Sequence, residues 1–286
     1  MHRAVLYTNP LAFNPAKPVF VAAEKRSPVR IQPVNVFDGE SLKPWYLRIN
    51  PKSTVPTLVT ADGKAVNESL EICRLLDNED GQPLGGNRVD RTLMEALLKE
   101  IDAWDGNLYA FGRAPEGTRG FLAKASDFRV KVAEARAREN PDLKEAYRAK
   151  IQAVLKQSAE ATDKAAVAAN QQQLRSLLDR ADQLLAKAAT STASTTLAPA
   201  GEAFLAGLAL SLADALMAAV LYRVNSLGQY QAEIGTRPAV RAYYQRLQAR
   251  PAWKTTFGPG DSTFVKLYWT LPAVVKATVL GTFGVY

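Results

Sequence analysis

Residues 50–69, with the sequence Asn-Pro-Lys-Ser-Thr-Val-Pro-Thr-Leu-Val-Thr-Ala-Asp-Gly-Lys-Ala-Val-Asn-Glu-Ser, decide the fold of the first part of this chain. Thr57–Val59 and Lys64–Val66 are short apolar runs separated by Ala61-Asp62-Gly63, which predicts two antiparallel strands joined by a turn. A helix is expected to begin at Ser69 and to continue to about Asp77. The stretch therefore predicts a β-β-α unit.

The sequence before this unit predicts a β-α-β unit. Residues 3–8 are an apolar run that ends in a turn, and Val29–Phe37 is expected to be a second strand. A helix between them passes through residues 19–25. Its start has two interpretations: Asn14 as N-cap with Pro15 in the first position, or a later start with Pro18 there. The order β-α-β followed by β-β-α is that of a thioredoxin-like domain.

Everything after the Gly- and Pro-rich residues 81–86 is expected to be helical. The first helix is expected over 93–111, with Leu93, Leu97, Ile101 and Trp104 on its buried face. It is followed by long helices within 122–187, a low-complexity loop at 190–199, a central buried helix at 205–224 and a helix at 237–247.

We divide the chain into a thioredoxin-like domain at 1–80, a linker at 81–88, an all-helical domain at 89–258 with a helical insertion at about 113–200, and an apolar tail at 259–286.

The tail does not qualify as a membrane-spanning helix by its sequence. Residues 264–286 are apolar, but Pro272 interrupts them and Lys266 and Lys276 add charge. Two interpretations stay open: the tail lies in a membrane interface, or it covers the protein's own surface.

The rare residues exclude several classes of chemistry. The chain has one cysteine, Cys73, and one histidine, His2, so it can form no internal disulfide and no Cys/His zinc site, and we expect no bound metal. Hydrolases of the Ser-His-Asp or Cys-His type would have to use His2 at the end of the chain. The net charge of +8 favours anionic partners, but the basic residues are scattered among acids, so we expect no nucleic-acid binding.

The first residues already have the pattern of a strand, without the apolar core and cleavage site of a secretory signal. We therefore expect a cytoplasmic protein that is able to associate peripherally with a membrane.

Four segments, in order and at family spacing, resemble the glutathione S-transferase superfamily. They are Leu6-Tyr7-Thr8-Asn9-Pro10-Leu11-Ala12-Phe13-Asn14, Asn50-Pro51-Lys52-Ser53-Thr54-Val55-Pro56-Thr57-Leu58, Asn67-Glu68-Ser69 and Ser211-Leu212-Ala213-Asp214. Within this family, residues 43–50, the long charged helices, residues 221–224 and the Leu271-Pro272 tail most resemble the tetrachlorohydroquinone-dehalogenase-like plant class and the ganglioside-induced differentiation-associated proteins. The resemblance implies an α/β thioredoxin-like domain followed by an all-α domain, with long inserted helices.

The resemblance also implies a site for glutathione as co-substrate. Ser69 would bind the γ-glutamyl carboxylate with its hydroxyl and its backbone N–H at a helix N-terminus, and Glu68 would pair with the ammonium group. Val55, before a cis Pro56, would offer its backbone N–H and C=O to the cysteinyl residue. On sequence alone the preferred interpretation of Ser69 is an ordinary N-cap.

Activation of the thiol is the step at which the sequence departs from the family. The resemblance places a hydrogen-bonding serine at position 12, where this chain has Ala12. Tyr7, Thr8 and Asn14 are the substitutes nearby, and Tyr7 and Asn14 are the candidate catalytic residues. Tyr7 also fits a strand aromatic that faces the core. We therefore expect glutathione to bind but to be activated weakly.

Two other reactive-looking features are expected to be structural. Ser211 and Asp214 have the spacing of a capping box, and Cys73 lies on an apolar helix without a second cysteine.

The sequence thus predicts a detoxifying transferase that conjugates glutathione to an apolar electrophile, or a related peroxidase or dehalogenase, and a homodimer as in the family. The alternative is a glutathione-binding but poorly catalytic module that associates with an anionic membrane through its basic helices and its tail.

Overall fold

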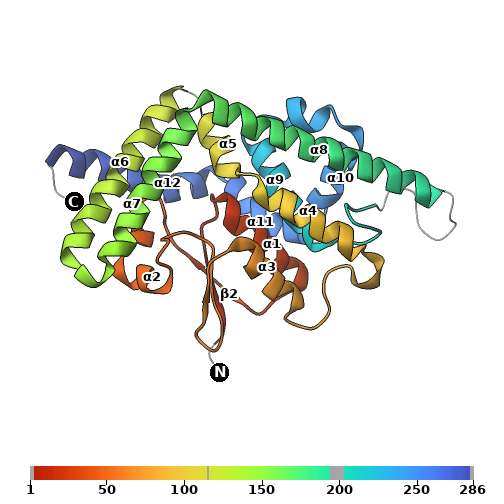
Figure 1. Ribbon diagram of the computed structural model, residues 1–286, viewed down its shortest axis with the longest axis horizontal. Helices are drawn as coiled ribbons and strands as arrows, with labels where there is room; N and C mark the ends of the chain where they lie inside the picture. Colours follow the sequence, from red (N-terminus) through yellow and green to blue (C-terminus); the bar gives the residue numbers. More distant parts are fainter. Residues whose placement is uncertain (1–2, 115, 194–202, 284–286) are drawn as a thin grey trace.

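The computed structural model describes residues 3–114, 116–193 and 203–283 (Figure 1). The elements of the first part are β1 (Val5–Thr8), α1 (Phe13–Lys25), β2 (Arg30–Pro33), the 3₁₀ helix η1 (Glu40–Leu42), α2 (Pro44–Ile49), β3 (Thr57–Val59), β4 (Ala65–Val66) and α3 (Ser69–Asn78). The rest are η2 (Gly86–Arg88), α4 (Arg91–Ala103), α5 (Gly106–Gly112), α6 (Glu116–Glu139), η3 (Pro141–Leu143), α7 (Lys144–Thr162), α8 (Lys164–Ala193), α9 (Leu212–Ser226), the π-helix η4 (Tyr230–Gly235), α10 (Pro238–Gln248), α11 (Pro251–Asp261) and α12 (Thr263–Phe283).

The first part is a four-stranded sheet in the order β2-β1-β3-β4. Strands β1 and β2 are parallel, whereas β1 with β3 and β3 with β4 are antiparallel. This mixed sheet, followed by an all-helical part, confirms the predicted fold class. Leu6 of β1 is fully buried against Phe20 of α1 and Ile72 of α3, in a core that continues into the helical part.

Two boundaries in the sheet domain differ from the sequence prediction. Helix α1 begins at Phe13, earlier than either predicted start, and contains Pro18. Strand β2 ends at Pro33 instead of continuing to Phe37. The carboxamide oxygen of Asn35 accepts hydrogen bonds from the backbone N–H groups of Phe37 and Asp38, so the chain turns there instead of pairing with the sheet.

Two helices in the second part are also shorter than predicted. The helix predicted over residues 93–111 divides into α4 and α5, because Asp105 caps α5 by accepting from the N–H groups of Asn107 and Leu108. The helix predicted from Leu205 begins instead at Leu212, where Ser211 and Asp214 form the expected capping box.

The long helices α6 and α7 form an antiparallel pair beside α2, and α8 runs along the top of the molecule in Figure 1. A second hydrophobic core joins this pair to the first domain, with Leu42 and Leu47 on one side and Phe128, Val132, Ala133 and Tyr147 on the other. The buried Tyr147 hydroxyl donates to the backbone carbonyl of Leu42 at 2.9 Å. The insertion is therefore packed onto the thioredoxin-like domain.

Helix α12 contains residues of the apolar tail and continues through Pro272. It is attached to the first domain at the loop after β2, where Asn35 Nδ2 donates to Trp269 O at 3.1 Å and Lys276 pairs with Asp38 at 3.0 Å. Its outer face nevertheless exposes several large apolar side chains. No helix in the described part of the chain is long and apolar enough to cross a membrane. Residues 194–199 of the predicted low-complexity loop and residues 284–286 of the tail lie outside the described residues, and α8 continues to Ala193.

Candidate functional site

The loop before β3 is fixed by buried polar side chains. Asn50, which is fully buried, donates from Nδ2 to Thr54 O and to Thr57 Oγ1, both at 2.9 Å. The Tyr46 hydroxyl donates to the same Thr54 carbonyl at 2.6 Å. These bonds hold the loop up to Val55, and the Val55-Pro56 peptide bond is cis, as the resemblance implied.

The backbone of Val55 is available for an extended ligand. Strand β3 pairs with β1 only from Thr57 onward. Among the described residues, none makes a hydrogen bond to the N–H or C=O of Val55. An extended peptide could therefore pair with Val55 in the manner of an added strand.

Ser69 is the first residue of α3, and Glu68 is its N-cap, with extended backbone angles and no side-chain capping bond. The backbone N–H groups of this helix end are therefore open to an anionic ligand. The exposed Glu68 carboxylate forms an ion pair with Lys52, which brings the loop before Val55 next to the start of α3. Asn67 Oδ1 is buried and has no hydrogen-bond partner within the described part of the chain, which suits it to accept from a ligand ammonium or amide group.

An unexpected residue supports this loop from the inserted helices. Lys150 of α7 is buried, and its Nζ donates to the backbone carbonyl of Ser53 at 2.9 Å. Burial, with a smaller contribution from the nearby Arg129 charge, lowers the pKa of Lys150 to about 7. Sequence reasoning could not identify this contact, because Lys150 stands among many other charged residues of a long helix.

The loop between β1 and α1 is also ordered by an asparagine. Asn9 is buried, donates to Val34 O at 3.1 Å, and accepts from the N–H of Leu11 at 3.0 Å. Ala12 follows as the N-cap of α1 with extended angles and no side-chain capping bond, and Asn14 is the second helical residue. The start of α1 thus presents backbone N–H groups but no hydroxyl at position 12.

Tyr7 lies on the face of the sheet opposite to Leu6. It is half-buried, and its ring packs against Trp45 at 5.9 Å and edge-on against Tyr46 at 5.7 Å between ring centroids. Thr8, by contrast, is buried. The catalytic roles considered for Tyr7 and Asn14 remain predictions.

Buried polar groups lie around Phe13, next to Ala12. The Phe13 ring contacts Trp104 edge-on at 5.4 Å, and Trp104 in turn contacts Tyr109 at 5.3 Å. Gly106 is required beside Phe13, because a Cβ there would lie 2.7 Å from the ring. Within the described residues, Trp104 Nε1 and the Tyr109 hydroxyl are buried without a hydrogen-bond partner.

Arg223 of α9 contacts the loop between β1 and α1. Its Nη2 donates to Leu11 O at 3.3 Å, and its guanidinium is 5.8 Å from the centroid of the Phe13 ring. Burial lowers the pKa of Arg223. Sequence reasoning did not identify Arg223 as a site residue, because its contact residue Leu11 lies at the other end of the chain.

The Ser211–Asp214 pair and Cys73 have structural roles, as expected from the sequence. Asp214 is fully buried and accepts from Ser211 N, Ser211 Oγ, Leu205 N and the Tyr243 hydroxyl. Cys73 is fully buried, and burial raises the pKa of its thiol, which disfavours the reactive thiolate. No group of three or more metal-ligating side chains occurs in the part of the chain that the structure describes.

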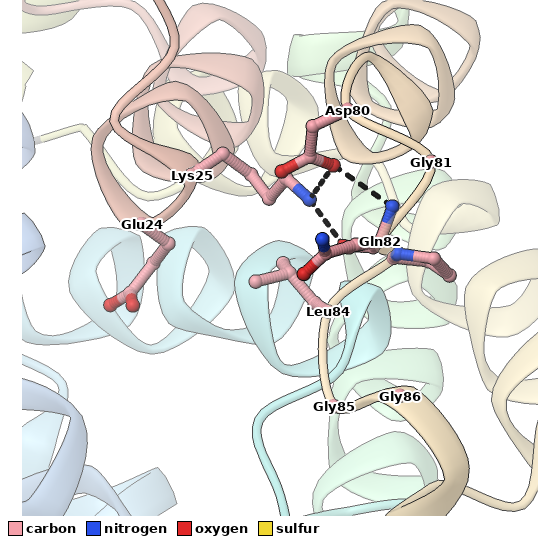
Figure 2. Close-up of a pocket in the computed structure, with 9 residues that line it drawn as sticks. Glu24, Lys25, Asp80, Gly81, Gln82, Leu84, Gly85 and Gly86 are labelled. Atoms are coloured by element: carbon pink, nitrogen blue, oxygen red, sulfur yellow. Dashed lines mark hydrogen bonds and ion pairs between the residues drawn. The ribbon is translucent and has the colours of Figure 1, made fainter.

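A surface hollow at the linker lies apart from the residues described above, and two of its polar side chains are bonded to one another. Figure 2 shows Lys25 pointing toward Asp80 and the Gln82 backbone; its Nζ pairs with Asp80 at 2.6 Å and also donates to Gln82 O. Glu24 on the same helix is engaged by Arg250 at 2.6 Å. These bonds attach α1 to the linker and to α11.

Two family models match the chain: the glutathione S-transferase N-terminal domain at residues 15–79 and the C-terminal domain at residues 144–251. Together they cover more than half of the sequence.

Curated relatives and solved structures agree with this match. Glutathione S-transferase TCHQD of Arabidopsis thaliana is 24% identical, with 88% of this chain and 89% of the relative covered. Tetrachloro-p-hydroquinone reductive dehalogenase of Sphingobium chlorophenolicum is 28% identical, with 77% and 81% covered. Human ganglioside-induced differentiation-associated protein 1-like 1 is 25% identical, with 91% and 75% covered. The structure of Ure2p in complex with glutathione superposes with a TM-score of 0.60 at 17% identity, covering 90% of this chain and 94% of that one. The chain belongs to the glutathione S-transferase family.

Proposed function

We propose that this protein is a glutathione S-transferase that joins the glutathione sulfur to an apolar electrophile. The observation that supports this most is the backbone of Val55, which no described residue pairs with. It lies next to cis-Pro56 and is linked through the Lys52–Glu68 pair to the open N-terminus of α3. These groups match the chemistry of glutathione, which offers a peptide backbone, an ammonium group and carboxylates.

In this proposal the tripeptide is held by Val55 and the start of α3. Ser69 and the helix N-terminus take the γ-glutamyl carboxylate, and the Glu68 carboxylate takes the ammonium group. Lys52 already forms an ion pair with Glu68, but both side chains are exposed, and such a pair contributes only about 0–1 kcal/mol to stability. The ligand ammonium group can therefore displace Lys52, or bind Glu68 together with it, at little cost in free energy.

The thiol would lie beside Ala12, at the start of α1, where backbone N–H groups and the helix dipole favour a thiolate. Tyr7 and Asn14 are the side-chain donors that we place near it. The electrophile would lie on the side of Phe13, Trp104 and Tyr109. The buried Trp104 N–H and Tyr109 hydroxyl, unpartnered within the described residues, suit an apolar substrate that carries a hydrogen-bond acceptor.

Glutathione-dependent dehalogenation belongs to the same proposal, since one relative is named for reductive dehalogenation of a chlorinated hydroquinone. The test is a steady-state assay of purified protein with glutathione and an activated aryl chloride, followed by a chlorinated hydroquinone. We expect conjugate or released chloride above the uncatalysed rate, and a higher KM for glutathione in Ser69→Ala. Rates equal to the uncatalysed reaction with a panel of aryl halides, enones and peroxides would contradict a catalytic role.

A second candidate function is binding to an anionic membrane surface, and helix α12 favours it. Phe264, Leu267, Tyr268, Leu271 and Val275 are between 47% and 76% exposed. Their spacing places them along one side of the helix. Residues 263–283 contain Lys266 and Lys276 but no acidic residue, which suits an anionic lipid surface.

The membrane proposal is tested by co-sedimentation with vesicles of phosphatidylserine and phosphatidylcholine. We expect Leu267→Glu/Leu271→Glu to release the protein from the vesicles. Leu155→Glu on α7, where the leucine is 50% exposed, is the matched control and should leave binding unchanged. Equal binding by all three proteins would contradict a role for α12.

A further inference from the structure

Arg223 is a partly buried cation next to the position that the thiol would occupy, and within the described residues it forms no ion pair. Its Nη2 is 3.3 Å from Leu11 O, and its Nε is buried and makes no hydrogen bond to any described residue. Its neighbour Tyr222 contacts Asp261 at 3.1 Å, so this nearby carboxylate is engaged by a phenol.

The other charge beside Phe13 is neutralised. Lys17 Nζ is 5.0 Å from the centroid of the Phe13 ring, but it pairs with Asp102 at 2.9 Å. Arg113, on the far side of Tyr109, donates to Gln229 at 2.9 Å. Arg113 also forms no ion pair with a described carboxylate, but it contacts Tyr109, so Arg223 is the uncompensated cation in contact with the β1–α1 loop.

A structural role accounts poorly for that charge. Arg223 lies in the last turn of α9, where the helix dipole favours a cation by about 0.3–1 kcal/mol. Withdrawing part of a guanidinium from water costs free energy, and one hydrogen bond to a carbonyl together with the dipole offsets this only in part. An anion bound at the start of α1 would offset the rest.

We propose that Arg223 supplies the positive charge that stabilises the glutathione thiolate in place of the hydroxyl missing at Ala12. This inference rests on the proposed function. The thiol proton passes to solvent, and the guanidinium and the N-terminus of α1 then face the negative sulfur. Guanidinium suits this role because it stays charged at every pH at which the protein is folded.

The test is an ultraviolet difference titration of bound glutathione thiolate from about pH 5 to about pH 9, on wild type and on Arg223→Gln and Arg223→Lys. Both variants keep a donor for Leu11 O, but only lysine keeps the charge. We expect the glutamine variant to raise the pKa of the bound thiol by about one unit or more, which lowers turnover below that pKa about tenfold. The lysine variant should stay close to wild type.

Arg246→Met is the matched control. Arg246 also donates to a backbone carbonyl, Ala203 O, lies 5.7 Å from an aromatic ring, has its pKa lowered by burial, and has a buried Nε without a hydrogen-bond partner among described residues. It is remote from the β1–α1 loop, so its replacement should not move the thiol pKa. If Arg223→Gln does not fold, Arg223→Met is the second neutral variant.

Binding of S-methylglutathione, which has no ionisable thiol, should be equal within about twofold in wild type and Arg223→Gln, since the charge acts on the sulfur. An unchanged thiol pKa in the neutral variants, or an equal rise in Arg223→Lys, would overturn the inference and leave the proposed function standing. No saturable glutathione binding by wild type would overturn both.

Discussion

The two sides of the candidate site differ in how fully this chain keeps the arrangement expected for glutathione. The side that would hold the tripeptide, Val55 to Ser69, has the cis bond, the open strand edge and the open helix end. The side that would hold the thiol has an alanine as the N-cap of α1. In the proposed function, recognition of the tripeptide relies largely on backbone groups, which most sequences retain if the fold is kept. Activation of the thiol depends on one side chain in this proposal, so a single substitution can remove that group or leave its role to a different residue.

Ala12→Ser is expected to have the largest effect, because it adds a hydrogen bond to the sulfur that the guanidinium charge proposed for Arg223 does not supply. The extended backbone at position 12 suits a serine N-cap. We expect turnover at neutral pH to rise about a hundredfold, or about 2.7 kcal/mol in transition-state stabilisation. Steady-state kinetics provide the measurement, and Ala16→Ser on the same helix is the control. An unchanged kcat in a folded Ala12→Ser protein would show that the groups already present, such as Arg223, activate the thiol without a hydroxyl at position 12.

Lys150→Met tests how the inserted helices support the tripeptide side. Lys150 has a pKa of about 7 in the folded protein against an ordinary 10.5, so the unfolded chain binds more protons between these values. Wild-type stability should therefore rise with pH across this window and be lost as pH falls toward 7. Relative to Lys150→Met, the free energy of unfolding of wild type should gain about 2 kcal/mol between about pH 7 and about pH 9.

Urea unfolding at several pH values measures this difference. Lys156→Met, on the same helix but 76% exposed, is the control and should show no such trend relative to wild type. A parallel pH dependence in wild type and Lys150→Met would mean that Lys150 is not held in a desolvated position.

Ser69→Ala should weaken the tripeptide side by about 1 kcal/mol, since it removes one hydrogen bond and leaves the helix N–H groups in place. Calorimetry should therefore show a glutathione Kd about fivefold higher, with kcat at saturation almost unchanged. A fall in kcat without a change in affinity would instead place Ser69 on the thiol side.

Glu68→Gln is expected to have the smallest effect. The carboxylate is exposed and shared with Lys52, so its pair with the ligand ammonium contributes about 0.5 kcal/mol, or roughly a twofold change in Kd. The change should shrink at high salt. A tenfold loss that is insensitive to salt would indicate that the bound ligand buries Glu68.

The order of elements could be predicted from sequence because it depends on local signals, whereas the cis bond before Pro56 was implied by the family resemblance. The hairpin turn at 61–63, the helix start at Ser69 and the capping box at Ser211 each specify their structure within a few residues. The boundary errors have local causes as well: Asp105 divides a continuous apolar pattern into α4 and α5, and Asn35 ends β2 by binding backbone N–H groups.

The long-range contacts of the site could not be predicted. Arg223 meets Leu11 across 212 residues, and Lys150 meets Ser53 across 97. In sequence, Lys150 looks like one more charged residue of a long helix, and Arg223 like a solvated cation in the last turn of an apolar one. Only their contacts in the folded chain distinguish them.

The most direct test of the central claim is a calorimetric titration of glutathione and of S-methylglutathione onto the purified wild-type protein. If the tripeptide side is a glutathione site, both ligands should bind at one site per chain with affinities within about tenfold of each other, and Ser69→Ala should weaken both. No saturable heat with either ligand would contradict the claim that this chain uses glutathione.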